Sequence, residues 1–262
     1  MGAYHKYLEA AKKAAEEAGA LLRADFFKPG EIFLKGEINL LTKSDTDSQE
    51  IIFGRLSRAF SGHGFLAEEG LNERGEGESE YRWIIDPLDG TTNFVHRFPV
   101  FCVSIGLVHL GKLACGVVFN PISAEMFWAA RGEGAFSNGQ RIRVSRVDDL
   151  NRGLLATGFP YDIRETKTNI SQHDLFLLRT QGIRRCGSAA LDLCFVASGR
   201  LDGFWELKLN PWDTAAGSMI VEEAGGRVTD FLGRPADIYR PEIVASNGLL
   251  HEAILEVLRS AR

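Results

Sequence analysis

The spacing of hydrophobic residues near the start of the chain predicts two helices. Between residues 7 and 25, apolar and charged positions alternate at helical intervals. One side of this amphipathic helix would carry Leu8, Ala11, Ala15, Ala18 and Leu22. A second helix is expected over residues 45–60.

A different pattern begins at Trp83, Ile84 and Ile85, which follow one another without a polar residue. Such a run of aromatic and β-branched residues suits a buried strand. The strand is expected to end at about Asp86, because Pro87 cannot donate a ladder hydrogen bond and Gly90 frees the backbone.

The remaining hydrophobic runs predict a change of architecture along the chain. Runs over residues 101–108, 112–120 and 124–130 predict antiparallel strands, and Asn138-Gly139 predicts a hairpin before residues 141–145. After Leu150, strands are expected to alternate with helices. The strands lie near Leu154, Ile183, Phe204, Val228 and Ile243, and the helices over 167–180, 189–198, 214–224 and 249–260. The prediction is an α/β protein, with an α+β subdomain at 1–148 and an α/β subdomain at 149–262 joined in one catalytic unit.

Candidate chemistry is densest in Asp86-Pro87-Leu88-Asp89-Gly90-Thr91-Thr92-Asn93-Phe94, at the exit of the buried strand. Two unpaired acids on a tight turn repel each other, and a hard cation removes the conflict. Oxygen-only ligands favour Mg²⁺. Gly90 would let a phosphate approach the main chain, and a short helix over 91–94 would attract anions. The alternative is a turn and helix cap, in which Asp89 and Thr91 satisfy only local donors.

Two further acidic segments extend this pattern. A helix is expected to begin at Trp212-Asp213 and end at paired glycines, with Ala215, Met219 and Ile220 on its packed side. Asp213 would lie in its first turn, where an acid also suits the helix dipole without any ligand. Glu68-Glu69 follows the apolar residues 65–67, and its alternative is a solvated surface.

Taken in order, these segments resemble the signatures of the inositol monophosphatase family. The matching residues are Ala67-Glu68-Glu69-Gly70, residues 83–94, Trp212-Asp213 with the four residues after it, and Glu222 with Ala224-Gly225-Gly226. Residues 39–45 are similar to the segment that the family usually has as Asp-Leu-Val-Thr-x-x-Asp, and residues 187–192 are similar to its substrate-binding helix start. The resemblance runs from about Asn39 to Asn247 and implies a layered αβαβα sugar-phosphatase-like fold.

The resemblance implies a site for two or three Mg²⁺ ions. Glu68, Asp86 and the main-chain carbonyl of Leu88 would hold the first ion, and Asp86, Asp89 and Asp213 the second. Thr91 and Asp45 would orient and help deprotonate a water molecule on the metal for in-line attack on phosphorus. The catalytic roles thus fall on Asp45, Thr91 and Glu68. Paired metal ions stabilise both the entering and the leaving oxygen in such a reaction.

Substrate contacts are implied for Asp89, Gly90, Thr91, Ser188, Ala189, Glu206 and Asp213. The start of the helix over 187–191 would offer N–H groups to the organic half, and Glu206 would accept hydrogen bonds from its hydroxyls. An equally good interpretation of Glu206 is an acid at a strand end that faces water. The chain departs from the family pattern at two places: Asn39 stands where the family often has Asp, and Lys35-Gly36-Glu37 is only loosely similar to the family's mobile metal-site loop.

Composition bounds the remaining possibilities. The chain has 262 residues, 45% of them hydrophobic, and a net charge of −5 that offers no basic surface for nucleic acid. Cys102, Cys115, Cys186 and Cys194 lack zinc-site spacing and are interpreted as reduced, buried cysteines. No export signal and no apolar stretch of roughly 20 residues is present, so a soluble cytoplasmic protein without membrane contact is expected. The resemblance and the prevalence of twofold assemblies favour a homodimer.

Two basic features have competing interpretations. Arg184-Arg185 would contact a substrate phosphate or a partner subunit, or form a solvated strand end. His96 is expected to pack or to lie on the surface rather than to act as a general acid.

The function predicted from these observations is Mg²⁺-dependent hydrolysis of inositol 1-phosphate by water, with inhibition by lithium. The alternatives within the same fold are phosphatases of fructose 1,6-bisphosphate, nucleotide bisphosphates or histidinol phosphate. An alternative of another class is a regulatory protein that works chiefly through a partner, as in RNA-polymerase-associated regulation.

Overall fold

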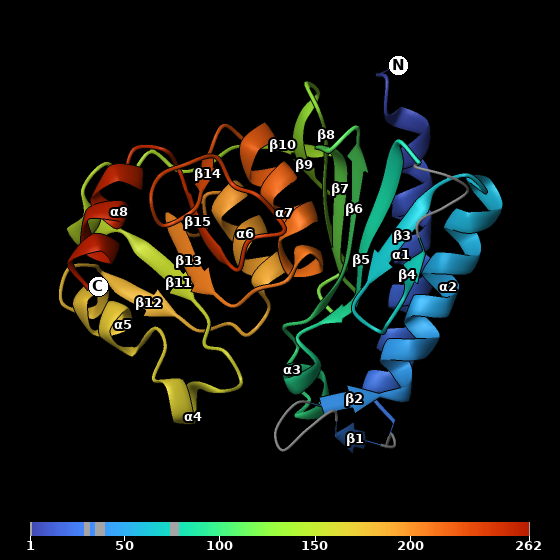
Figure 1. The fold of residues 1–262 in the computed structure, drawn as a ribbon, viewed down its shortest axis with the longest axis horizontal. Coiled ribbons are helices and arrows are strands. Elements are labelled where there is room, and N and C mark those ends of the chain that lie inside the picture. Colours follow the sequence, from blue (N-terminus) through green and yellow to red (C-terminus); the bar gives the residue numbers. More distant parts are fainter. Residues whose placement is uncertain (1, 29–31, 35–39, 74–78, 262) are drawn as a thin grey trace.

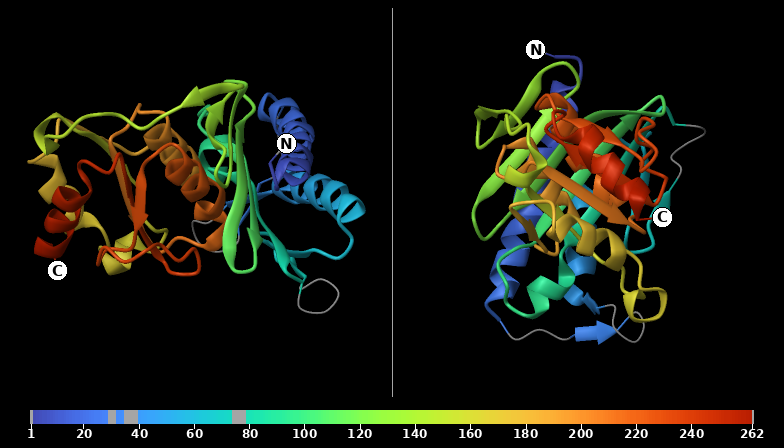
Figure 2. Two further views of the ribbon diagram at one scale, coloured as in Figure 1. Left: turned by 90° about the horizontal axis from the view of Figure 1, so that it is seen from above. Right: turned by 90° about the vertical axis from the view of Figure 1, so that its left-hand side faces the viewer.

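The computed structural model describes residues 2–28, 32–34, 40–73 and 79–261. Figure 1 shows alternating layers: helices α1 and α2, a large sheet, helices α6 and α7, a smaller sheet, and helices α5 and α8. Seen from above, the α6–α7 pair separates the two sheets (Figure 2). The predicted αβαβα layering is confirmed. Asn39 and residues 35–37 lie outside the described residues.

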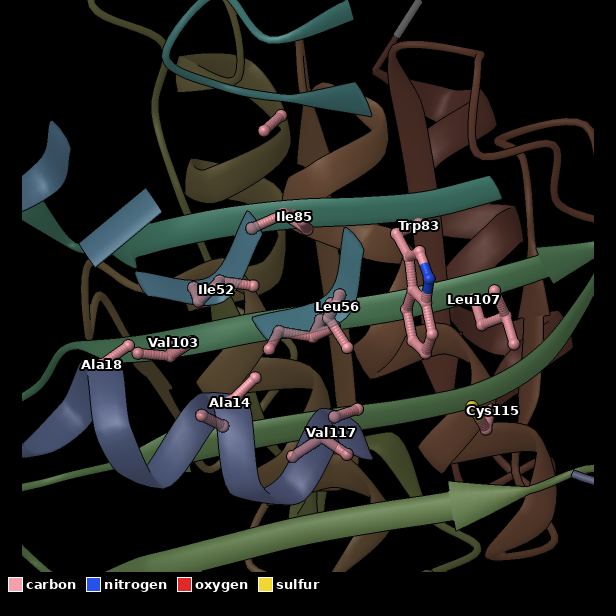
Figure 3. Packing of buried hydrophobic residues seen from close by; sticks show 14 of the residues in the cluster. Ala14, Ala18, Ile52, Leu56, Trp83, Ile85, Val103, Leu107, Cys115 and Val117 are labelled. Carbon is pink, nitrogen blue, oxygen red and sulfur yellow. The ribbon is translucent and has the colours of Figure 1, made fainter. Parts of the chain in front are cut away.

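The outer layer beside the large sheet consists of α1 (His5–Phe26) and α2 (Lys43–Ala59). All five residues predicted for the inner face of α1 are buried. In Figure 3, Ala14 and Ala18 of α1 and Ile52 and Leu56 of α2 face the large sheet. The first hydrophobic core therefore lies between these helices and the sheet.

The large sheet has eight described strands in the order β10-β9-β8-β7-β6-β5-β3-β4. Neighbours are antiparallel except β3 and β5, which are parallel. The bounds are β3 Gly64–Ala67, β4 Asn72–Glu73, β5 Tyr81–Asp89, β6 Cys102–His109, β7 Lys112–Asn120, β8 Glu125–Ala130, β9 Gly134–Ser137 and β10 Gln140–Ile142. A separate pair joins β1 (Ile32–Leu34) and β2 (Leu40–Thr42). The predicted antiparallel strands and the hairpin at Asn138-Gly139 are confirmed, although β10 ends earlier than expected.

The smaller sheet has the described order β12-β11-β13-β15-β14. β11 is parallel to β12 and β13, while β15 is antiparallel to β13 and β14. The bounds are β11 Leu154–Thr157, β12 Gly182–Arg184, β13 Gly203–Leu207, β14 Arg227–Thr229 and β15 Glu242–Ser246. Each strand lies where the sequence placed it. The subdomain boundary at 148/149 stays a prediction.

The helices of this half are α4 (Ile163–Thr166), α5 (Ile170–Leu177), α6 (Ala189–Ala197), α7 (Pro211–Glu223) and α8 (His251–Ser260), with a 3₁₀ turn at Leu150–Arg152. The helix predicted over 167–180 is shorter than expected and follows a separate turn, α4. Lys167 and Asn169 adopt left-handed backbone angles, with φ of 53° and 69°. Such angles break an α-helix, so no continuous helix can cross this segment.

Helix α7 differs from its prediction in having no exposed middle face. Residues 214–221 are all buried because α7 lies between the two sheets, beside α6. A Cβ atom at Gly217 would stand 2.5 Å from Leu193 Cδ1 of α6, and one at Gly116 would stand 2.8 Å from Ala216 Cα. These two glycines therefore permit the close packing of α7 against α6 and β7.

Other predictions concern single residues and the membrane. In the described part of the chain, no helix is both long and apolar enough to cross a bilayer. The four cysteines are free, as expected, but Cys186 is only half-buried. His96 is exposed, in agreement with a surface position.

Candidate active site

A bulge in β5 brings the two motif aspartates to the same side of the sheet. The strand was expected to end at Asp86, but it continues to Asp89. Asp86 pairs with Ser104 and Asp89 with Cys102, so Pro87 and Leu88 together oppose one residue of β6. The bulge also accommodates a proline that cannot donate to the ladder. The side chains of residues three apart in a regular strand point to opposite faces, and the extra residue of the bulge brings those of Asp86 and Asp89 to the same face.

The two aspartates line a cavity of about 750 Å³. One wall comes from β5, α3 (Thr91–Val95) and Glu68, which follows β3. The opposite wall comes from residues 158–164, the start of α6, the end of β13 and the start of α7. The sequence-predicted residues that line it are Glu68, Asp86, Leu88, Asp89, Gly90, Thr91, Ser188, Ala189, Glu206 and Asp213. The fold thus gathers residues more than a hundred positions apart.

The acids of this cavity are close enough to destabilise one another's charge. Burial raises the pKa of Asp86 well above its ordinary value, and the nearby Glu68, Asp89 and Asp213 raise it further. Burial and then the charge of Asp89 raise the pKa of Asp213 to about 8. Carboxyl groups that raise one another's pKa in this way are relieved by a proton or a cation between them.

The chemistry of these donors fits divalent metal ions. Asp86, Asp89 and Asp213 form no salt bridge with any described residue, and their oxygen atoms are the ligands that Mg²⁺ prefers. In the described part of the chain, no three acidic, histidine or cysteine side chains form a ready-made metal cage. Leu88 N donates to Asp86 Oδ1 (3.0 Å), and Asn210 N donates to Asp213 Oδ2 (2.7 Å). The donor set therefore suits the metal, although the side chains are turned partly toward protein donors.

Asp45 lies directly behind Thr91, although it does not line the cavity itself. The hydroxyl of Thr91 lies 3.1 Å from Asp45 Oδ1 and 3.1 Å from the carbonyl oxygen of Leu88. Thr42 holds the other oxygen of Asp45, with N–H and hydroxyl donors at 2.8 and 2.6 Å, in the capping box of α2. Burial raises the pKa of Asp45. The structure thus joins the two residues that the resemblance paired.

The start of α6 contacts the acid cluster directly through Asp89. Ser188 donates its hydroxyl proton to Asp89 Oδ2 at 2.6 Å, and Ala190 N donates to the same oxygen at 2.8 Å. Asn93 fixes the preceding turn by donating to the carbonyl oxygen of Cys186 at 2.8 Å. The Ser188 side chain is thus directed to Asp89, and the predicted substrate contact of the N–H groups at this helix start stays a prediction.

Glu206 and Arg185 occupy the part of the cavity formed by the second half. Glu206 is half-buried, and a Cβ atom at Gly158 would stand 2.0 Å from its Oε1, so the carboxyl group lies against that glycine. Burial raises the pKa of Glu206 well above its ordinary value, and Arg185 opposes the shift. Of the two arginines at the end of β12, Arg185 lines the cavity, whereas the guanidinium of Arg184 bonds the carbonyl oxygen of Ile183.

Two parts of the site were not predicted as functional from the sequence. The wall at 158–164 includes Tyr161, which is half-exposed. The sequence feature that could have indicated this loop is Gly158-Phe159-Pro160, which ends β11, since loops at the carboxyl ends of strands commonly form ligand sites. Asp192 is buried and lines the cavity, and its Oδ1 lacks a hydrogen-bond partner. It belongs to the segment 187–192 that resembles the family's substrate-binding helix start, but nothing local distinguished it from a helix-surface acid.

Comparisons with known proteins cover nearly the whole chain. Residues 3–262 match the model of the inositol monophosphatase family. An inositol-1-monophosphatase of Synechocystis sp. is 44% identical over 254 residues, which are 96% of this chain and 88% of that protein. The Nus factor SuhB of Escherichia coli is 40% identical over 258 residues, which are 97% of this chain and 96% of that protein.

Solved structures agree with the sequence comparison. The structure of the inositol monophosphatase from Anabaena (Nostoc) sp. superposes with a TM-score of 0.90 at 40% identity, covering 99% of this chain and 97% of that one. The fold, the ordered acidic segments and the match along the chain therefore lead to one conclusion. This chain belongs to the inositol monophosphatase family.

Proposed function

We propose that this protein is a Mg²⁺-dependent phosphomonoesterase that hydrolyses inositol 1-phosphate to inositol and phosphate. Family membership supports phosphatase activity; the substrate and the metal are the proposal. The observation that carries it is that Glu68, Asp86, Asp89 and Asp213 line one cavity together with the Thr91–Asp45 pair. Such a cluster of acids is unfavourable without cations, and phosphate supplies no positive charge to relieve it.

The residues that would hold the metal are the four acids with the main-chain carbonyl of Leu88, and Asp86 would be shared between ions. When bound, Mg²⁺ neutralises the phosphate charge and lowers the pKa of coordinated water. Little covalent chemistry is left to the protein in phosphoryl transfer, because positioning and charge stabilisation dominate.

The Thr91–Asp45 pair supplies a route for the proton of the attacking water. The Thr91 hydroxyl has one proton, which it donates to Asp45 or to the carbonyl of Leu88, and its lone pairs remain able to accept a proton from water. The buried Asp45, with its raised pKa, is a stronger base than an exposed aspartate. As the new P–O bond forms, the bond from phosphorus to the ester oxygen breaks. That oxygen takes up a proton from a second water molecule and leaves as the alcohol, while Asp45 holds the proton of the attacking water.

The organic half of the substrate would lie against the wall from the second half. Glu206 lines that wall and has acceptor oxygens suited to the hydroxyls of a polyol. The N–H groups at the start of α6 lie on the same side of the cavity, where Ala189 is a lining residue. A polyol monophosphate matches this combination of acids and main-chain donors.

Phosphate release from four substrates tests the proposal. Inositol 1-phosphate, fructose 1,6-bisphosphate, an adenosine bisphosphate and histidinol phosphate are compared with and without Mg²⁺. We expect Mg²⁺-dependent release, fastest from inositol 1-phosphate. The Asp89→Asn variant should lose it, whereas Asp174→Asn, at a 70%-exposed side chain on α5, should keep it. Faster phosphate release from one of the other substrates would replace inositol 1-phosphate by that substrate and leave the family unchanged.

A second candidate function is regulation through a protein partner. Its basis is that two relatives, 41% and 40% identical, are named Nus factor SuhB. A folded protein that binds Mg²⁺ but releases phosphate from none of the four substrates would favour this candidate.

A further inference from the structure

Asp89 is held by three donors that converge on a single oxygen. Ser188 Oγ lies 2.6 Å from Asp89 Oδ2, Ala190 N lies 2.8 Å from it, and Cys102 Sγ lies 3.7 Å from it. The last is within the range of a weak thiol hydrogen bond. With Oδ2 occupied by protein donors, Oδ1 is the oxygen left for a ligand.

The strongest of these donors is itself held in place. Ser188 is the N-cap of α6, and its Oγ accepts a hydrogen bond from Leu191 N at 3.4 Å while it donates to Asp89. Cys102 Sγ lies 3.6 Å from the same hydroxyl oxygen. Ser188 is 2% exposed and Cys102 is fully buried, so bulk water is poorly placed to replace either donor.

The contact also joins the two halves of the molecule. Asp89 ends β5 in the large sheet, whereas Ser188 begins α6, which packs between the sheets. An N-cap needs only to accept a hydrogen bond from its own helix. Donation to Asp89 from the other side of the same hydroxyl serves a different purpose, because it fixes the rotation of the carboxyl group.

We propose that Ser188, assisted by Cys102, is a positioning residue that fixes Asp89 for metal binding and so ties α6 to the metal site. The inference rests on the proposed role of Asp89 as a Mg²⁺ ligand. Groups that hydrogen-bond to a ligand orient it, and their loss commonly weakens metal affinity by about 10- to 100-fold.

The test compares Mg²⁺ dissociation constants by isothermal titration calorimetry, with unfolding midpoints measured in EDTA. Ser188→Ala should weaken Mg²⁺ binding about 10-fold or more, whereas Ser188→Thr should stay near wild type because it keeps the hydroxyl. Ser198→Ala is the matched control, since Ser198 caps the other end of α6 through the carbonyl of Cys194. Ser198→Ala should lower the midpoint without changing the Mg²⁺ constant.

A second pair of variants keeps the inference testable if Ser188→Ala does not fold. Cys102→Ala should weaken Mg²⁺ binding by a smaller factor of about 2 to 5, because a thiol is a weak donor. Cys115→Ala, at another buried cysteine on β7, should not change it.

The outcomes separate this inference from the proposed function. Wild-type Mg²⁺ binding that persists unchanged in folded Ser188→Ala and Cys102→Ala would overturn the positioning role alone. Failure of the wild type to bind Mg²⁺ at all would overturn the proposed function and the inference with it. Weakened binding in Ser188→Ala, with Ser188→Thr and Ser198→Ala near wild type, supports it.

Discussion

Replacing Thr91 with alanine removes the hydroxyl that connects Asp45 to the cavity. The hydroxyl lies 3.1 Å from Asp45 Oδ1 and from the Leu88 carbonyl oxygen. Asp45 would remain held by the N–H and hydroxyl of Thr42, because those bonds go to its other oxygen. The substitution therefore interrupts the proposed proton route without releasing the base.

The magnitudes for stability and rate differ enough to be separated. Losing one buried hydrogen bond to a charged group costs about 1.5–3 kcal/mol of folding free energy. A domain with a stability of about 5–15 kcal/mol remains folded after such a loss. Losing a general-base route costs about 10²- to 10⁴-fold in turnover, or about 2.7–5.5 kcal/mol of activation free energy.

The assay is steady-state phosphate release at saturating Mg²⁺, with folding checked by circular dichroism. Thr91→Ser should recover most of the activity because it keeps the hydroxyl. Thr46→Ala, on the first turns of α2, should match wild type, since among the described residues its hydroxyl donates to the nearby Lys43 carbonyl and to no other group. The acid limb of the wild-type pH profile should lie above the ordinary aspartate range, because the pKa of Asp45 is raised and the base must be ionised. A folded Thr91→Ala with turnover within about twofold of wild type would refute a route that should contribute at least 10²-fold.

Three other predictions follow from the same site and core. Asp213→Asn should lower turnover by about 10²-fold or more with little loss of folding stability, because it removes a proposed metal ligand at the edge of the core. Full Mg²⁺-dependent activity in this variant would contradict the proposed set of metal ligands. Burial raises the pKa of Asp192 from 3.8 to about 8, so its contribution to stability is complete below pH 4 and is lost as the pH rises through 8. In urea unfolding with EDTA, Asp192→Asn should reduce the fall in folding free energy between pH 5 and 8 by up to about 1.4 kcal/mol per pH unit. Equal slopes of folding free energy against pH in the variant and the wild type would count against the raised pKa. Gly217→Ala should destabilise the fold by about 1–3 kcal/mol, because its Cβ would overlap Leu193. Gly54→Ala in α2 should stabilise the fold by about 0.5–1 kcal/mol, because alanine is the better helix former and its Cβ would meet only the end of the flexible Arg58 side chain. Thermal unfolding that ranks the two variants in the opposite order would refute the packing argument.

The sequence alone determined the elements whose pattern is local. The inner face of α1 was predicted correctly because helical periodicity records burial on one side, and the strands β6 to β8 were predicted because turn residues separate their apolar runs. The acidic segments were recognised from their order, and the structure gathers Glu68, Asp86, Asp89 and Asp213 around one cavity.

Only the tertiary structure decided how those acids are oriented and what surrounds them. The bulge at Pro87-Leu88 depends on pairing with β6, and the burial of residues 214–221 of α7 on all sides depends on a second sheet packing over them. Ser188 turns to Asp89 because α6 and β5 meet across 99 residues of chain, and residues 158–164 become a wall of the site for the same reason. Local sequence preferences fix the backbone over a few turns, whereas contacts between distant segments depend on how whole sheets and helices pack, and no short stretch of sequence contains that information.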